Sequence, residues 1–170
     1  MFKKINITLI LISVLSFYST LINSNDIKKI QIVKDIHNID TMELLDFKEN
    51  ISSIKEKKAQ YYILNFWASW CAPCIKEMKS LNLFQKNNPN IRVLTISEDN
   101  NISNSITFFK RNNYEFFEKY YDKGKKIYSL FPIRGLPTSF IADNNYKVFA
   151  KVEGIIDWNS KDFKDWLFSN

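Results

Sequence analysis

Two cysteines separated by two residues, placed where an apolar strand gives way to a helix, constrain this chain more than any other feature. Residues 61–68 form a continuous apolar run broken only by Asn65, which is typical of a central strand buried on both faces. The sequence therefore predicts that a strand delivers Cys71 to the start of a helix that contains Cys74. Proline is tolerated in a first helical turn, and from Pro73 onward apolar residues recur at helical spacing: Met78, Leu81 and Phe84, with Ile75 and Leu83 widening the stripe.

The position of the pair predicts redox chemistry. Unpaired N–H groups and the positive end of the helix dipole favour a thiolate at a helix start, so Cys71 is the predicted nucleophile and Cys74 the more buried resolving thiol. The spacing brings both sulfurs within disulfide geometry. The alternatives are a pair of inert core cysteines and half of a zinc site. Zinc would need two further ligands, yet the chain has no other cysteine and His37 is its only histidine. Disulfide exchange without a metal or other cofactor is therefore favoured.

The rest of the pattern indicates an α/β fold. A strand over 91–97 follows the helix, and the order strand, helix, strand favours a parallel pair. The turn residues 143–145 predict an antiparallel hairpin. The other expected elements are a β-like stretch at 30–33, a helix over 103–111, a β-like aromatic patch over 114–121, a short helix over 125–131, hairpin strands over 138–142 and 146–152, and a last helix from the N-cap Ser160 to Phe168.

Residues 1–25 are interpreted as an export segment ahead of a single domain over 26–170. Lys3 and Lys4 precede a mostly apolar stretch, and no acidic residue appears before Asp26. The two lysines should stay in the cytoplasm, which sends the rest of the chain outward. The stretch is long for a signal peptide and just long enough to span a bilayer, so a cleaved signal peptide and a retained membrane anchor are both open. A periplasmic location, or one at the extracytoplasmic face of the membrane, is expected.

The net charge does not point to a nucleic-acid partner. It is +6, from 24 basic and 18 acidic residues, and becomes +4 (22 against 18) without Lys3 and Lys4. The lysines are scattered and usually lie near an acidic residue, whereas a nucleic-acid groove needs clustered arginine and lysine.

The stretch from Leu64 to Cys74 closely resembles the active-site strand and loop of TlpA/ResA-type proteins, which are thioredoxin-like and membrane-anchored. The resemblance extends from Tyr61 to the end of the chain, because further matches follow in the family's order. It implies a thioredoxin-like fold, in which helices flank a central mixed β-sheet with an extra helix–strand insertion. The further matches are Glu77, Ser97–Glu98–Asp99, Arg134–Gly135–Leu136–Pro137–Thr138, Glu153–Gly154 and Trp158.

The resemblance also implies roles for residues around the cysteines. Pro137 matches a cis proline that lies against the cysteines, which leaves the backbone of Leu136 free to pair with an extended substrate. Trp70, directly before the first cysteine, is also expected to bind substrate. Glu77 is expected to accept the proton of the second cysteine or to shape the partner surface. The alternative for Glu77 is an ordinary solvated helix glutamate.

One residue separates the chain from plain thioredoxins, and two features depart from the TlpA/ResA pattern. Asn65 stands where thioredoxins place a buried aspartate that handles the proton of the resolving cysteine, and an amide cannot titrate. Lys79 stands where ResA-like proteins often have proline, which predicts a straighter helix. The segment before Tyr61 lacks the family's Gly-Lys turn, which leaves the N-terminal hairpin without its usual signal.

The predicted function is reduction of disulfides in partner proteins outside the cytoplasmic membrane. A membrane thiol donor would supply the electrons, and the targets would be cytochrome c or copper-centre apoproteins that need free cysteines. One alternative is an oxidant that forms disulfides, although such proteins often have histidine where Ala72–Pro73 stands. Another is a copper-binding chaperone, although no histidine follows Cys74.

Overall fold

Strand β4 (Tyr61–Trp67) is the centre of the fold, and all seven of its residues are buried. It pairs in parallel with β5 (Ile91–Ser97) and antiparallel with β7 (Thr138–Asp143). The computed structural model describes residues 26–34, 36 and 38–169. The other strands in this part of the chain are β1 (Ile30–Ile32), β2 (Glu43–Asp46), β3 (Ile51–Ser53), β6 (Glu118–Tyr121) and β8 (Val148–Glu153).

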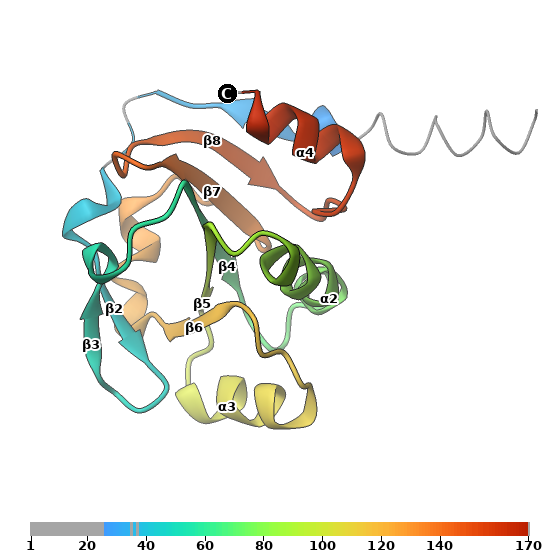
Figure 1. The fold of residues 1–170 in the computed structure, drawn as a ribbon. Helices are drawn as coiled ribbons and strands as arrows, with labels where there is room; N and C mark the ends of the chain where they lie inside the picture. The colour runs from blue at the N-terminus through green and yellow to red at the C-terminus, as the bar shows by residue number, and fades with distance from the viewer. Residues whose placement is uncertain (1–25, 35, 37, 170) are drawn as a thin grey trace, which may run out of the picture.

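The described strands form one mixed sheet, in the order β1-β8-β7-β4-β5-β6-β2-β3 (Figure 1). β6 extends the parallel part beside β5, and the remaining pairs are antiparallel. The predicted parallel pair and the C-terminal hairpin are both confirmed. The carboxyl ends of three parallel strands therefore meet at one end of the sheet, and the cysteines follow directly after β4.

The helices α2 (Ala72–Asn87), α3 (Ile102–Arg111) and α4 (Lys161–Phe168) begin at N-cap residues whose side chains accept a backbone N–H. Such caps satisfy donors that would otherwise lack a partner at the helix start. The caps are Cys71, Asn101 and the predicted Ser160.

The sheet separates two apolar cores, because alternate residues of β4 face opposite sides. Ile63 and Trp67 pack with helix residues in the first core: Met78, Leu81, Phe84, Phe163 and Leu167. Tyr62, Leu64 and Phe66 pack on the other face with Ile39, Leu44, Ile54, Ile127 and Phe131. Asn65 shares the face of Ile63 and Trp67, so the amide points toward α2.

Only part of the aromatic patch predicted over 114–121 is a strand. Pairing with β5 begins at Glu118. Tyr114 and Phe117 instead pack against the rings of α3, with centroid distances of 6.2 Å from Tyr114 to Phe108 and 5.9 Å from Phe117 to Phe109. Packing between aromatic rings thus replaces strand pairing over the first half of the patch.

The short helix predicted over 125–131 is confirmed only in part. One 3-10 helix, η4 (Tyr128–Leu130), lies within it, and another, η3 (Lys123–Lys125), ends where the predicted helix begins. Lys125 has φ 56°, in the left-handed region that a continuous right-handed helix excludes. The Asp122 carboxylate accepts hydrogen bonds from the backbone N–H groups of Ile127 at 3.0 Å and Tyr128 at 2.7 Å. These bonds close the chain into a turn.

The apolar stripe predicted for α2 is narrower than expected. Ile75 and Leu83 are 37% and 45% exposed, whereas Glu77 lies on the buried face. The hairpin strand predicted from 146 begins two residues later, because Tyr146 occupies a turn position with φ 66°. The β2–β3 hairpin forms without a Gly-Lys turn.

The interpretation of residues 1–25 as an export segment falls outside the described residues. In the described part of the chain, no helix is long and apolar enough to cross a membrane.

Candidate active site

Cys71 and Cys74 form a disulfide at the start of α2, with their Cα atoms 5.3 Å apart. Cys71 is the N-cap, and its Sγ accepts a hydrogen bond from the Cys74 N–H at 3.3 Å. Cys71 is 5% exposed and Cys74 is fully buried. After reduction, this N–H and the helix dipole would stabilise a thiolate on Cys71. The geometry therefore fits an outer nucleophile and an inner resolving thiol.

The loop before the disulfide is held by Asp99, which lies just beyond the end of β5. Its carboxylate accepts hydrogen bonds from the Ser69 N–H at 3.1 Å and the Ser69 hydroxyl at 2.8 Å. The hydroxyls of Ser97 and Ser105 lie 3.0 and 2.6 Å from its other oxygen. Asp99 is buried, so these bonds form away from water and tie the loop to β5 and α3.

Glu77 is buried on α2, one turn after Cys74, and is held by two neutral donors. Asn65 Nδ2 donates to one carboxylate oxygen at 2.8 Å, and Trp158 Nε1 donates to the other at 3.2 Å. Asn65 also donates to the Ser139 hydroxyl at 2.9 Å. The structure therefore brings together three residues of the family resemblance, and the alternative of a solvated surface glutamate is wrong.

Burial gives Glu77 an unusual proton affinity. Desolvation raises its pKa to about 7, although the hydrogen bonds from Asn65 and Trp158 and the positive charge of Lys29 act to lower it. A carboxyl with this pKa can both hold and release a proton near neutral pH, which an ordinary glutamate cannot do.

The Leu136–Pro137 peptide bond is cis, as the family resemblance predicts. Thr138, the next residue, pairs with Phe66 near the carboxyl end of β4. The cis bond therefore lies at the same end of the sheet as the disulfide. The carbonyl of Pro137 accepts the Gly154 N–H at 2.9 Å, which links this loop to the end of β8.

Trp70 lies directly before Cys71 and is 67% exposed. A large aromatic side chain beside a reactive sulfur, with most of its surface in water, is available for contact with a partner protein.

The family resemblance includes Ser97–Glu98–Asp99, but the sequence alone assigned these acids no role. In the structure Glu98 is 2% exposed, and neither carboxylate oxygen has a hydrogen-bond partner among the described residues. Burial raises its pKa to about 8, assisted by the nearby negative charge of Asp122. The sequence did carry a signal for Glu98. It directly follows a buried parallel strand, and ligand-binding and active sites form at the carboxyl ends of such strands.

Replacing Glu98 with glutamine is expected to stabilise the protein at alkaline pH. The folded-state pKa lies above the ordinary value of 4.5, so ionising Glu98 opposes folding. This destabilisation is absent below about pH 4.5, grows between about pH 4.5 and pH 8, and is complete above about pH 8. Glu98→Gln should raise the free energy of unfolding by about 2 kcal/mol at pH 8.5.

Urea unfolding at pH 4.5 and pH 8.5 measures this effect, with the exposed Glu43→Gln as the matched control. An equal change in the free energy of unfolding at both pH values would contradict the raised pKa of Glu98.

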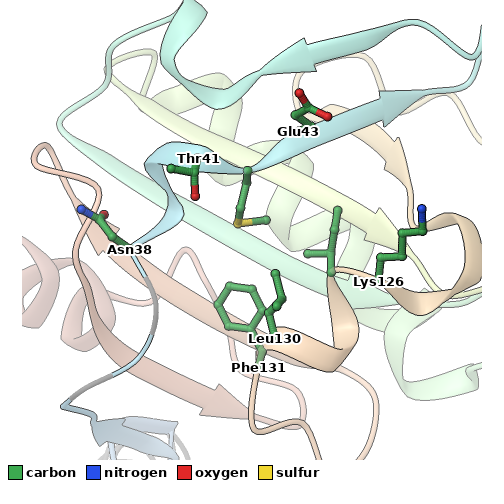
Figure 2. Close-up of a pocket in the computed structure, with 8 residues that line it drawn as sticks. Asn38, Thr41, Glu43, Lys126, Leu130 and Phe131 are labelled. Atoms are coloured by element: carbon green, nitrogen blue, oxygen red, sulfur yellow. The ribbon is translucent and has the colours of Figure 1, made fainter.

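A cavity of about 420 Å³ lies between the segment before β2 and the η3–η4 region. Figure 2 shows Leu130 and Phe131 on one side, with Asn38, Thr41 and Glu43 on the other. No predicted site residue lines this cavity, so it is separate from the disulfide. In the part of the chain that the structure describes, no cluster of three His, Cys, Asp or Glu side chains could hold a metal. His37 lies outside the described residues.

Comparison with known proteins agrees with this geometry. The thioredoxin-like family model matches residues 59–148, more than half of the chain. Thiol-disulfide oxidoreductase ResA of a Bacillus cereus strain is 32% identical over 131 residues, which cover 76% of this chain and 73% of that protein. ResA of Geobacillus thermodenitrificans is 26% identical over 137 residues, which cover 74% and 72%.

Solved structures show the same fold. StoA from Bacillus subtilis superposes with a TM-score of 0.63 at 23% identity, over 77% of this chain and 99% of that one. A putative thiol:disulfide interchange protein DsbE from Chlorobium tepidum superposes with a TM-score of 0.69 at 23% identity, over 79% and 98%. With its cysteine pair closed as a disulfide at a helix start, the chain belongs to the thioredoxin-like family and is a thiol–disulfide oxidoreductase of the TlpA/ResA type.

Proposed function

We propose that this oxidoreductase reduces disulfides in partner proteins outside the cytoplasm. The observation that carries the proposal is the buried Glu77, which Asn65 and Trp158 hold one helical turn after Cys74. Residues three apart on a helix share a face, so the carboxyl is suited to take the proton of the buried thiol. Asn65 cannot do so, because an amide does not titrate.

The reaction transfers two electrons from the dithiol to the partner. The Cys71 thiolate attacks a partner sulfur, forms a mixed disulfide and releases the first partner thiolate. Cys74 then passes its proton to Glu77 and attacks Cys71 Sγ, which releases the second partner thiolate and closes the Cys71–Cys74 disulfide. The partner disulfide is reduced and the enzyme dithiol is oxidised.

The cis-proline loop and Trp70 would hold the partner during the exchange. The Leu136 backbone, beside Pro137, would pair with an extended segment around the target disulfide, as in other cases of strand addition. The exposed indole of Trp70 would contact side chains of the same segment.

The sequence and the family resemblance support a compartment and a class of partners. The basic start and apolar stretch of residues 1–25 favour export, with that segment either removed or retained in the membrane. A membrane thiol donor would then return the disulfide to the dithiol. Apoproteins of cytochrome c or of copper centres are suitable targets, because their cysteines must be free before they take up a cofactor.

The reduction potential decides between a reductase and an oxidant. A reductase is expected nearer the thioredoxin value of about −270 mV than the value of about −120 mV for the strong oxidant DsbA. This gap of about 150 mV corresponds to roughly 7 kcal/mol for two electrons. Equilibration of the protein with glutathione and dithiothreitol buffers, followed by counting of free thiols, measures it. A value near the oxidant end would leave the cysteine roles intact and overturn the reductase proposal.

A further inference from the structure

Glu77 borders a cavity that is built partly from the N-terminal segment. The cavity has a volume of about 390 Å³ and is open to solvent. Asp26 and Lys29 line it from the N-terminal side, Lys76 from α2, and Asp157 from the loop after β8. Both oxygens of the Glu77 carboxylate accept hydrogen bonds from buried side chains that do not titrate, those of Asn65 and Trp158. Glu77 also lines this cavity, so the cavity offers a path between Glu77 and water.

Lys29 is fixed at the rim of this cavity. It directly precedes β1, which pairs antiparallel with β8 and joins the N-terminal segment to the sheet. Its Nζ donates to the carbonyl of Ile155 at 2.5 Å and to the Asp26 carboxylate at 3.3 Å. Asp26 in turn accepts the Asp157 N–H at 2.9 Å. The ammonium is thus held in place from both sides of the cavity.

The charges around the cavity act on Glu77 in opposite directions. Lys29 and Lys76 favour the carboxylate, whereas Asp26 and Asp157 oppose it. Lys29 is only partly exposed, at 39% of its side chain, while Lys76 is exposed to solvent. Water screens an exposed charge more effectively, so Lys29 has the larger influence, and its positive charge lowers the pKa of Glu77.

We propose that Lys29 is a positioning residue of this oxidoreductase, which acts through Glu77 and favours release of the accepted proton into the cavity near neutral pH. The inference rests on the proposed role of Glu77 as proton acceptor. It extends the active site to a segment near residue 29, outside the stretch 59–148 that the family model matches. The segment before β1 then helps to position the proton acceptor, in addition to pairing with the sheet.

Titration of the Glu77 carboxyl by carbon-13 NMR tests the inference directly, with glutamate-labelled full-length protein in the disulfide form. Lys29→Gln should raise the midpoint of the Glu77 titration and lower its carboxylate-to-carboxyl ratio at pH 7 about two-fold. Lys29→Arg should keep the wild-type midpoint, because it keeps the charge. Lys76→Gln, which removes the same charge from the same cavity, should have a smaller effect.

Salt provides a second measurement of the same interaction. Added salt screens partly exposed charges, so it should raise the Glu77 midpoint more in the wild type than in Lys29→Gln. The backbone signals of β1 report whether the strand still pairs with β8. An unchanged midpoint in Lys29→Gln with β1 in place, or an equal shift in Lys76→Gln, would overturn the role of Lys29.

The result is separable from the proposed function of Glu77. The midpoint is measured on the carboxyl itself, whether or not the carboxyl takes part in the reaction. A shifted midpoint together with a thiol pH profile that Glu77→Gln leaves unchanged would retain the electrostatic coupling and remove the catalytic role. An unshifted midpoint together with a thiol pH profile that Glu77→Gln alters would retain the catalytic role of Glu77 and remove the electrostatic coupling to Lys29.

Discussion

Cys74→Ser should leave the enzyme covalently attached to its partners through Cys71, whereas Cys71→Ser should capture none. Cys71 caps the helix and is the more accessible sulfur, so it attacks first. Without the buried thiol at 74, the mixed disulfide cannot be resolved from within the enzyme. Non-reducing electrophoresis of the two variants expressed in the native host, followed by mass spectrometry of the adducts, measures the difference.

The double variant Cys71→Ser/Cys74→Ser is the matched control for non-specific association. Both single variants should also lose turnover in an insulin or model-peptide reduction assay, because a single thiol cannot complete the cycle. Equal capture by the two single variants would contradict the division of roles between outer and inner sulfur.

Glu77→Gln should slow resolution of the mixed disulfide by roughly 100-fold at pH 7, in the range typical of general acid–base catalysis. In the wild type the rate should rise as Glu77 ionises, around its pKa of about 7. In the variant that rise around pH 7 should disappear, because a glutamine amide does not titrate. Stopped-flow measurement of resolution between pH 5 and pH 9 gives both profiles.

A loss of stability cannot account for the slower rate. The folded-state pKa of Glu77 is raised above 4.5, so its ionisation opposes folding increasingly as pH rises through about 7. Glu77→Gln removes this effect and should be at least as stable as the wild type at pH 8. Glu115→Gln, an exposed glutamate, is the control. Overlapping profiles of wild type and Glu77→Gln would return Glu77 to a structural role.

The central part of the fold could be predicted because each of its features is local. The apolar run that became β4 and the proline after Cys71 specify a strand and a helix start without reference to distant residues. The segment over 114–121 was harder, because Tyr114 and Phe117 satisfy their apolar surface against rings of α3. A strand-like composition is the same whether aromatic residues pair in a sheet or pack on a helix.

The active site divides in the same way. The cysteine pair is specified by its spacing, and Glu77, Trp158 and Leu136–Pro137 were found through the resemblance. The burial of Glu77 depends on contacts with residues 12 and 81 positions away, Asn65 and Trp158, and no helical pattern in the sequence indicates it. The sequence did not indicate Lys29 for the same reason. Only the pairing of β1 with β8 brings it close to Ile155, 126 positions further along the chain.

The two edge strands of the sheet restrict how other polypeptides can pair with this enzyme. In the described part of the chain, the edge strands β1 and β3 have only three residues each. A longer edge would offer a row of free N–H and C=O groups on which any extended polypeptide could assemble. These short edges offer little of that, although Ile32 and Ile51 expose apolar side chains there. An extended partner of the kind proposed above would therefore find little free backbone at these edges, and would pair instead with the loop beside the disulfide.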